Sequence, residues 1–267
     1  MALRAAHPDA TVTGWDRPDV LEQAVAKGAI AHAATSLAAA VAAADLVYVA
    51  LPISATLDAL PEIARHARAG ALVTDAAATK TSICRAAARH FKTGAHFLGG
   101  HPLAGREVSG IEHASAALFR GARYVLIAEP GAVQAPPAAF ESLLLEIGAE
   151  PVWLDADTHD WAAGIISHLP QLASVALAGV VRDETDETGL PLTLAATGLR
   201  DALRLSGSPY SVWRDVCLTN RDNLIRSLDR LIQALEHIRG NLASRELEQQ
   251  FRAANEIYKA LHDRSLG

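Results

Sequence analysis

The sequence predicts an α/β protein in two parts, a doubly wound parallel sheet over residues 1–154 and an all-helical region over residues 155–267. Two observations support this prediction. Short β-branched segments alternate with helical patterns up to Leu154, which is typical of a doubly wound sheet. After Asp155 no convincing strand pattern remains, and apolar residues recur at helical spacing instead. We therefore expect a domain boundary near Leu154.

The strand patterns of the first part are short and apolar. Residues 45–51 form an unbroken apolar run of the kind buried on both faces of a parallel sheet. Pro18 lies near the first turn of a predicted helix, and Gly28 ends it. The patterns predict strands at 11–16, 45–51, 71–75, 96–100, 123–128 and 150–154, and helices at 18–28, 36–44, 54–67, 79–91 and 134–147.

Two long helices are expected in the second part. Residues 161–181 are apolar nearly all round, which predicts a buried helix, and Pro170 should kink it. In the other helix, from Leu224 to Leu242, the apolar residues follow a 4-3-4-3-4 spacing, the pattern of a helix packed along another helix. This seam fits a bundle within one chain and equally a contact between two copies of the chain.

Composition excludes several classes of protein. The 267 residues carry a formal net charge of −6, without the basic excess that general nucleic-acid binding requires. Cys84 and Cys217 form no CxxC pair, which excludes a disulfide scaffold and a cysteine zinc site and favours the reducing cytoplasm. No other metal-binding motif is present. The apolar stretch 36–57 is divided by Asp45 and Pro52 into segments of globular size, so we expect no membrane span.

The first residues lack the start of a dinucleotide-binding unit. Such a unit opens with a strand and a GxGxxG turn, and an acidic residue follows roughly 20 residues later. Asp16 occupies the acidic position, but no GxGxxG precedes it, and residues 2–6 resemble the end of a helix. We therefore expect the chain to begin inside the first βαβ unit. Asp16 fits equally well as an ordinary helix N-cap.

Three segments concentrate residues capable of chemistry. In Gly99–Gly110, four glycines and one proline surround His101 where a predicted strand ends, the place where open α/β sheets bind ligands. Histidine is the side chain best suited to proton transfer near neutral pH. A histidine that merely completes a tight turn is the plainer interpretation.

The second segment contains His159 and the run Ser167-His168-Leu169-Pro170-Gln171. The two histidines are nine residues apart, which is not a zinc-binding spacing. The third segment runs from Gly198 to Asp215 and contains Asp201 and Arg204. An arginine there could hold a carboxylate with its planar fork, although a solvated helix face with Arg–Asp pairs explains any single arginine as well.

Together these segments resemble the prephenate dehydrogenase family. The resemblance covers nearly the whole chain and is carried by GGHPLAGREVSG around His101, His159-Asp160, SHLP around His168, and Arg204 followed by Trp213-Arg214-Asp215 and Asn220. It implies a Rossmann-like NAD-binding domain, an all-helical domain that builds a homodimer, and a cytoplasmic enzyme of tyrosine biosynthesis. The implied reaction is the NAD-dependent oxidation of prephenate to 4-hydroxyphenylpyruvate with loss of carbon dioxide.

The resemblance also implies roles for individual residues. His101 accepts a hydrogen bond from the C4 hydroxyl of the substrate, and Arg204 holds a substrate carboxylate. The remaining implied contacts fall into two sets, with Glu107, His159, His168, Gln171 and Asp201 around the substrate and Asp16, Pro52 and Thr79 around NAD.

Three positions depart from the family pattern. The Gly-rich loop is absent, Ala78 stands where a serine is usual, and Gln171 replaces the last histidine of SHLPH. Because the last position lies near the substrate side chain, arogenate, the amino analogue of prephenate, is an alternative substrate. The missing loop leaves a third alternative, a catalytically silent dimer of the same fold.

Overall fold

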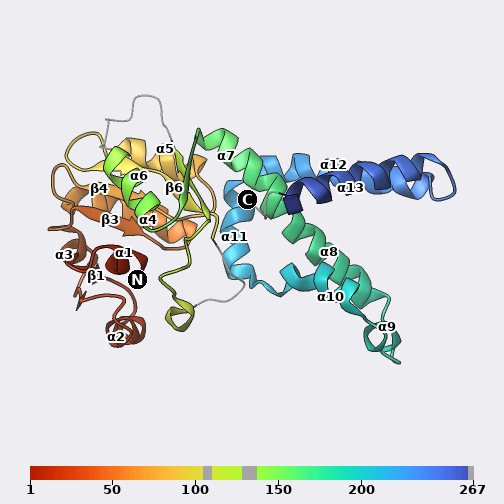
Figure 1. Cartoon of the computed structure of the whole chain (residues 1–267), viewed down its shortest axis with the longest axis horizontal. Helices are drawn as coiled ribbons and strands as arrows, with labels where there is room; N and C mark the ends of the chain where they lie inside the picture. The colour runs from red at the N-terminus through yellow and green to blue at the C-terminus, as the bar shows by residue number, and fades with distance from the viewer. Residues whose placement is uncertain (105–109, 128–136, 264–267) are drawn as a thin grey trace. The chain divides into compact units, whose positions relative to one another are not determined.

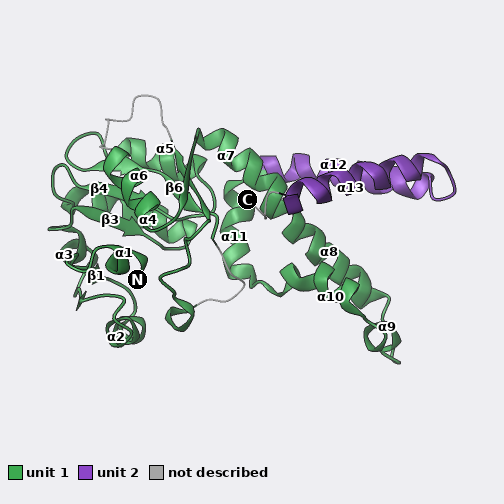
Figure 2. Cartoon of the chain, viewed as in Figure 1, with its two compact units in different colours: residues 1–221 green, residues 222–267 purple. Residues whose placement is uncertain are grey.

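The computed structural model describes residues 1–104, 110–127 and 137–263. The chain separates into two compact units, residues 1–221 and residues 222–267 (Figure 2). The predicted boundary near Leu154 lies inside the first unit, between the last described strand and the helix that begins at Ala156.

The first part of unit 1 alternates strands and helices as expected (Figure 1). Its strands are β1 (Thr13–Gly14), β2 (His32–Ala33), β3 (Leu46–Val49), β4 (Leu72–Asp75), β5 (His96–Leu98), β6 (Gly100–Pro102), β7 (Arg123–Ile127) and β8 (Glu150–Leu154). Its helices are α1 (Ala2–Ala6), α2 (Pro18–Ala26), α3 (Leu37–Val41), α4 (Ile53–His66), α5 (Thr81–His90) and α6 (Pro137–Glu146), with a 3-10 turn at Ile111–His113. The apolar stretch 36–57 is divided into α3, β3 and the start of α4, as Asp45 and Pro52 predicted.

The strands form three small sheets. One joins β1 to β2, a second has the order β3-β4-β5, and both are parallel. In the third, β6-β7-β8, strand β7 pairs antiparallel with β6 and parallel with β8. Asp16 and Pro52 follow the carboxyl ends of β1 and β3, and Asp75 is the last residue of β4. The loops after these three strands form the edge of the sheets where we expect a ligand to bind.

The main core lies between the β3-β4-β5 sheet and the helices that pack against it. It is built from aliphatic side chains such as Val49, Leu60, Ile63, Val73 and Ile83. Strand β4 is buried at all four positions, but Tyr48 of β3 is exposed. The expectation that residues 45–51 are buried on both faces is therefore wrong at Tyr48, whose hydroxyl reaches the Tyr124 hydroxyl.

The second part is helical, as predicted. Unit 1 continues with α7 (Ala156–Ala163), α8 (Leu169–Asp183), α9 (Leu190–Thr193), α10 (Thr197–Leu203), a 3-10 turn (Arg204–Gly207) and α11 (Tyr210–Thr219). Unit 2 holds α12 (Arg221–Gly240), apart from its first residue, and α13 (Glu246–Asp263). Leu242, the last residue of the predicted seam, lies beyond the end of α12.

A π-helical turn, Gly164–His168, separates α7 from α8. It lies directly before Pro170, which has no N–H to continue an α-helical ladder. The N–H of Leu169 instead bonds to the carbonyl of Gly164, five residues earlier, so the helix is widened directly before the proline. Such π turns occur frequently at functional sites.

Within one chain, the helix that contains this turn is buried on only part of its surface. Trp161, Ile166 and Val180 are each more than half exposed. By length and composition alone, Ala156–Asp183 is the one described helix that could cross a membrane. Much of its apolar surface is therefore exposed in the single chain.

Candidate functional site

Strand β6 positions His101. We expected a loop after residue 100, but Gly100–Pro102 pairs with β7, and His101 lies opposite Val125. The two glycines before it are required by close approach, because a Cβ at Gly99 would lie 2.7 Å from the Cys84 Sγ. The pairing fixes the backbone of His101, so this histidine does more than complete a tight turn.

His101 is the end of a chain of three hydrogen-bonding side chains. Its Nδ1 lies 2.8 Å from the Nε2 of His159, and the Nδ1 of His159 lies 2.8 Å from the Asp160 carboxylate. Asp160 in turn accepts the backbone N–H groups of Lys80 and Thr81 at 2.7 and 2.9 Å. Helix α5 begins at Thr81, and unpaired N–H groups at a helix start are suited to bind a carboxylate.

This arrangement fixes the tautomers of both histidines. A carboxylate can only accept, so the Nδ1 of His159 carries hydrogen and its Nε2 is an acceptor. His101 must then donate from Nδ1, which leaves the lone pair of its Nε2 available. A neutral His101 in this tautomer is a base.

Burial keeps that base neutral. The pKa of His101 is held well below 6.5 by desolvation, and repulsion from His159, Lys80 and His168 lowers it further against the opposing effect of Asp160. Burial alone would raise the pKa of Asp160, but hydrogen bonds from His159 and from the N–H groups of Thr81 and Lys80 outweigh it and lower the pKa. The site therefore pairs a neutral base with an ionised carboxylate.

His168 joins the same network from the π turn. The side-chain nitrogen of Asn220 donates to the carbonyl of Asp160 at 2.7 Å and lies 3.1 Å from the Nδ1 of His168. Because an amide N–H₂ only donates, His168 accepts on Nδ1 and presents an N–H at Nε2. Burial is the main cause that lowers the pKa of His168 to about 4.

Gln171 and Arg204 lie in a second group of residues. Gln171 is buried and its amide nitrogen donates to the carbonyl of Leu205 at 2.8 Å. Its Oε1 has no hydrogen-bond partner among the described residues. Arg204, next to Leu205, is exposed, as is Asp201 one turn before it. Glu107 lies outside the described residues.

The expected NAD contacts lie at the edge formed by the strand ends. Asp16 is exposed, and its carboxylate accepts the N–H of Arg17 at 2.7 Å. Pro52 is exposed at the start of α4, whereas Thr79 is fully buried and its hydroxyl lies 2.8 Å from the Thr219 hydroxyl. An exposed carboxylate after an early strand suits the hydroxyls of an adenosine ribose and would repel a 2′-phosphate. The residues at this edge therefore fit NAD better than NADP.

Helix α11 fastens the start of α4 beside this edge. The Asp215 carboxylate accepts the N–H of Ser54 at 2.9 Å and also its hydroxyl, and it pairs with Arg214 at 2.9 Å. These hydrogen bonds, first from Ser54 and then from Arg214, lower the pKa of Asp215 to about 2. Sequence reasoning missed the roles of Asp160, Asn220 and Asp215, although each stands in a motif that carried the resemblance.

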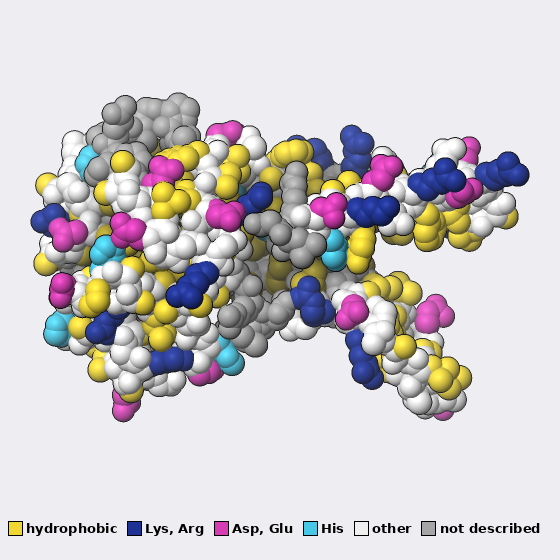
Figure 3. All heavy atoms as spheres, viewed as in Figure 1, with side chains coloured by type: hydrophobic (Ala, Val, Ile, Leu, Met, Phe, Trp, Pro, Cys, Tyr) yellow, Lys and Arg dark blue, Asp and Glu magenta, His cyan; other side chains and the backbone are white. Residues whose placement is uncertain are grey.

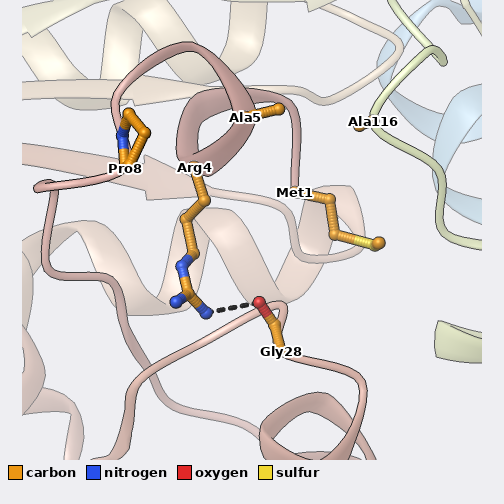
Figure 4. Close-up of a pocket in the computed structure, with 6 residues that line it drawn as sticks. All are labelled: Met1, Arg4, Ala5, Pro8, Gly28 and Ala116. Atoms are coloured by element: carbon orange, nitrogen blue, oxygen red, sulfur yellow. Dashed lines mark hydrogen bonds between the residues drawn. The ribbon is translucent and has the colours of Figure 1, made fainter.

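Two of the hollows on the described surface lie beside His159 and beside α1. One, of about 130 Å³, has His159 in its wall and is otherwise mostly apolar, with side chains such as Val125, Val152 and Ala163. It is smaller than the roughly 300 Å³ of typical ligand pockets. The other lies beside α1, where Arg4 donates to the Gly28 carbonyl (Figure 4). Among the described residues, no group of three His, Cys, Asp or Glu side chains could hold a metal ion.

Comparison with known proteins gives consistent matches. Residues 1–150 match the family model described as prephenate dehydrogenase, nucleotide-binding domain, and residues 155–256 match prephenate dehydrogenase, dimerization domain. A prephenate dehydrogenase of Lactococcus lactis is 32% identical over 98% of this chain and 73% of the relative.

Solved structures share the fold. Prephenate dehydrogenase from Aquifex aeolicus, solved with hydroxyphenyl propionate and NAD+, has a TM-score of 0.88 at 22% identity, over 98% of this chain and 92% of that one. Synechocystis arogenate dehydrogenase has a TM-score of 0.82 at 28% identity, over 97% of this chain and 94% of that one. The Rossmann-like nucleotide-binding domain followed by a helical domain is thus confirmed.

Proposed function

Because this chain belongs to the prephenate dehydrogenase family, whose models match residues 1–150 and 155–256, we propose that it oxidises prephenate to 4-hydroxyphenylpyruvate and carbon dioxide with NAD. The observation that carries the proposal is the chain of hydrogen bonds from Asp160 through His159 to His101. It presents a neutral imidazole with an available lone pair, as removal of a hydroxyl proton requires.

The main catalytic task of the protein's own side chains in this reaction is to remove the proton of the C4 hydroxyl. The Nε2 of His101 accepts the proton of the C4 hydroxyl while C4 loses a hydride, and the bond between C1 and its carboxylate then breaks as the ring becomes aromatic. NAD, when bound, accepts the hydride. The positive charge that develops on His101 is stabilised through His159 by the Asp160 carboxylate, in the manner of an Asp-His pair in hydrolases.

Binding roles follow from the same site. We assign Arg204 to a substrate carboxylate, with His168, His159, Gln171, Asp201 and Glu107 around the substrate. The N–H that His168 presents at Nε2 suits a carboxylate or keto oxygen. Asp16, Pro52 and Thr79 are assigned to NAD, Asp16 at the adenosine ribose. Thr79 would act through its main chain, because its hydroxyl is engaged by Thr219.

Arogenate is the second candidate substrate, and Gln171 favours it. The Oε1 of Gln171 is a buried acceptor without a partner among the described residues. An ammonium group can donate to it, whereas the keto oxygen of prephenate cannot. The structural relative from Synechocystis is named an arogenate dehydrogenase.

The test is a comparison of initial rates of NADH formation with prephenate and with arogenate. Formation of 4-hydroxyphenylpyruvate from prephenate supports the first proposal, and formation of tyrosine from arogenate alone supports the second. If neither substrate yields NADH, the chain is the silent dimer of our third alternative.

We also propose a homodimer in which residues 155–267 form the interface. Apolar side chains such as Val180, Ile232, Leu235, Phe251 and Ile257 are exposed in the single chain, and Figure 3 shows hydrophobic side chains along unit 2. Burial of such surface is favourable by about 25 cal/mol per Å². The match to a dimerization domain supports a second copy as the cover. Light scattering that reports a monomer at micromolar concentration would contradict this.

We also propose that the enzyme acts in the cytoplasm.

A further inference from the structure

The Lys80–Asp75 ion pair takes no part in the proton transfer proposed above, although it lies next to the strand that carries His101. Both side chains are fully buried, and the lysine ammonium contacts the aspartate carboxylate directly. Lysine is almost never fully buried unless it is paired. A buried pair is weak evidence for stability, because apolar side chains of similar volume often serve as well. The pair therefore calls for another explanation.

The pair holds both sides of Gly100, the residue directly before His101. Asp75 accepts the Gly100 N–H through Oδ1 at 3.1 Å, and the Nζ of Lys80 donates to the Gly100 carbonyl at 2.6 Å. A Cβ at Gly100 would lie 2.7 Å from the Asp75 carbonyl oxygen, so only glycine permits this approach. Both backbone hydrogen-bonding groups of Gly100, the first residue of β6, are thus held by the ion pair.

Lys80 also holds the other end of the histidine chain. Its backbone N–H donates to Asp160 at 2.7 Å, and Asp160 holds His159 at 2.8 Å. One residue therefore contacts the strand that carries His101 through its side chain and the carboxylate that orients His159 through its main chain.

We propose that Lys80 is a positioning residue, whose ammonium, paired with Asp75, sets the contact between His101 and His159. The inference rests on the proposed function, in which His101 is the base. Loss of the ammonium frees the Gly100 carbonyl and lets β6 shift, and a shift of about 1 Å in a reacting group can cost about 100-fold in rate.

Lys80→Met alone leaves Asp75 buried without its partner and can unfold the protein. The double variant Asp75→Asn/Lys80→Met removes both charges at similar volume, and the amide oxygen introduced at position 75 can still accept the Gly100 N–H. We expect the double variant to fold with a lower Tm, because the introduced amide N–H₂ faces the Ala77 N–H, which the Asp75 Oδ2 accepts at 3.0 Å in the wild type. Its kcat should be about 10- to 100-fold lower with little change in KM. Lys92→Met, a change of an exposed lysine just after α5, is the matched control and should leave both constants unchanged.

A second readout needs neither substrate nor NAD. Nitrogen-15 NMR of the histidine rings reports which nitrogen of His101 carries hydrogen, with the signals assigned by their loss in His101→Asn. The groups that face His101 are His159, Lys80, His168 and Asp160, and the cation of Lys80 is one cause of the low pKa of His101. In the double variant we expect the Nδ1–H preference to weaken and the pKa of His101 to rise.

The two readouts separate the proposals. If the wild type oxidises neither substrate, the proposed function fails, and the NMR experiment still tests Lys80. A double variant with wild-type kcat, or with wild-type tautomer and pKa of His101, overturns the positioning role.

Discussion

The Nδ1 of His101 lies 2.8 Å from the Nε2 of His159, and this contact determines what His101 can do. Because Asp160 fixes the hydrogen of His159 on Nδ1, His101 must direct its own hydrogen toward His159. The Nε2 lone pair is then available for a substrate hydroxyl. The proposed mechanism thus depends on a residue two hydrogen bonds away from the reacting atoms.

Replacement of Asp160 by asparagine should disable the base without removing it. In either orientation the amide N–H₂ faces a backbone N–H, because the Oδ1 of Asp160 accepts both His159 and the Lys80 N–H, and its Oδ2 accepts the Thr81 N–H. The variant also lacks the negative charge that stabilises the imidazolium formed on His101. We expect kcat to fall by about 10²- to 10⁴-fold, as for other losses of an orienting carboxylate or base. Steady-state kinetics of NADH formation measure this.

Asp157→Asn, an exposed change in the same helix α7, is the control for that variant and should be nearly silent. An Asp160→Asn enzyme that folds and retains wild-type kcat would show that His101 does not depend on the charge of Asp160.

Arg204→Ala should affect substrate affinity more than turnover. If the guanidinium holds a carboxylate equally in the ground and transition states, KM rises and kcat changes little. Arg200→Ala, a change of an exposed arginine one turn earlier in α10, should leave KM unchanged. A fall in kcat at unchanged KM for Arg204→Ala would assign it to the chemical step instead.

The sequence predicted the alternation of strands and helices, because this depends on local patterns. A local pattern also singled out His101 as the candidate base. Strand β6 was not predicted: Gly100-His101-Pro102 has the composition of a turn, and only its pairing with β7 makes it extended. The network around His101 was also beyond prediction, since Lys80, Asp160 and Asn220 meet through tertiary contacts over long sequence separations. The apolar pattern of the helix from residue 161 predicted burial. The pattern alone could not show whether the core of one chain or an interface between two chains buries it.

Acidification should destabilise the fold through His168. Its pKa is about 4 in the folded protein and near 6.5 when unfolded, so the unfolded chain binds the proton first. Stability is therefore complete above about pH 6.5 and is lost as the pH falls toward about 4, by up to about 3 kcal/mol from this residue.

Urea unfolding of the wild type and of His168→Asn at neutral and acidic pH measures the contribution. The difference in unfolding free energy between the two pH values should be smaller in the variant, whose residue 168 does not titrate. Equal pH dependence in both proteins would remove His168 as its source.

The most direct test of the proposed mechanism is the pH dependence of kcat/KM for NADH formation from prephenate, compared between the wild type and His101→Asn. Because burial lowers the pKa of His101, wild-type activity should persist below pH 6.5 and then fall as the base becomes protonated. In the variant we expect the rate to drop about 10²- to 10⁴-fold and this acid limb to flatten. A variant with near-normal activity and an unchanged acid limb would contradict the assignment of His101 as the base.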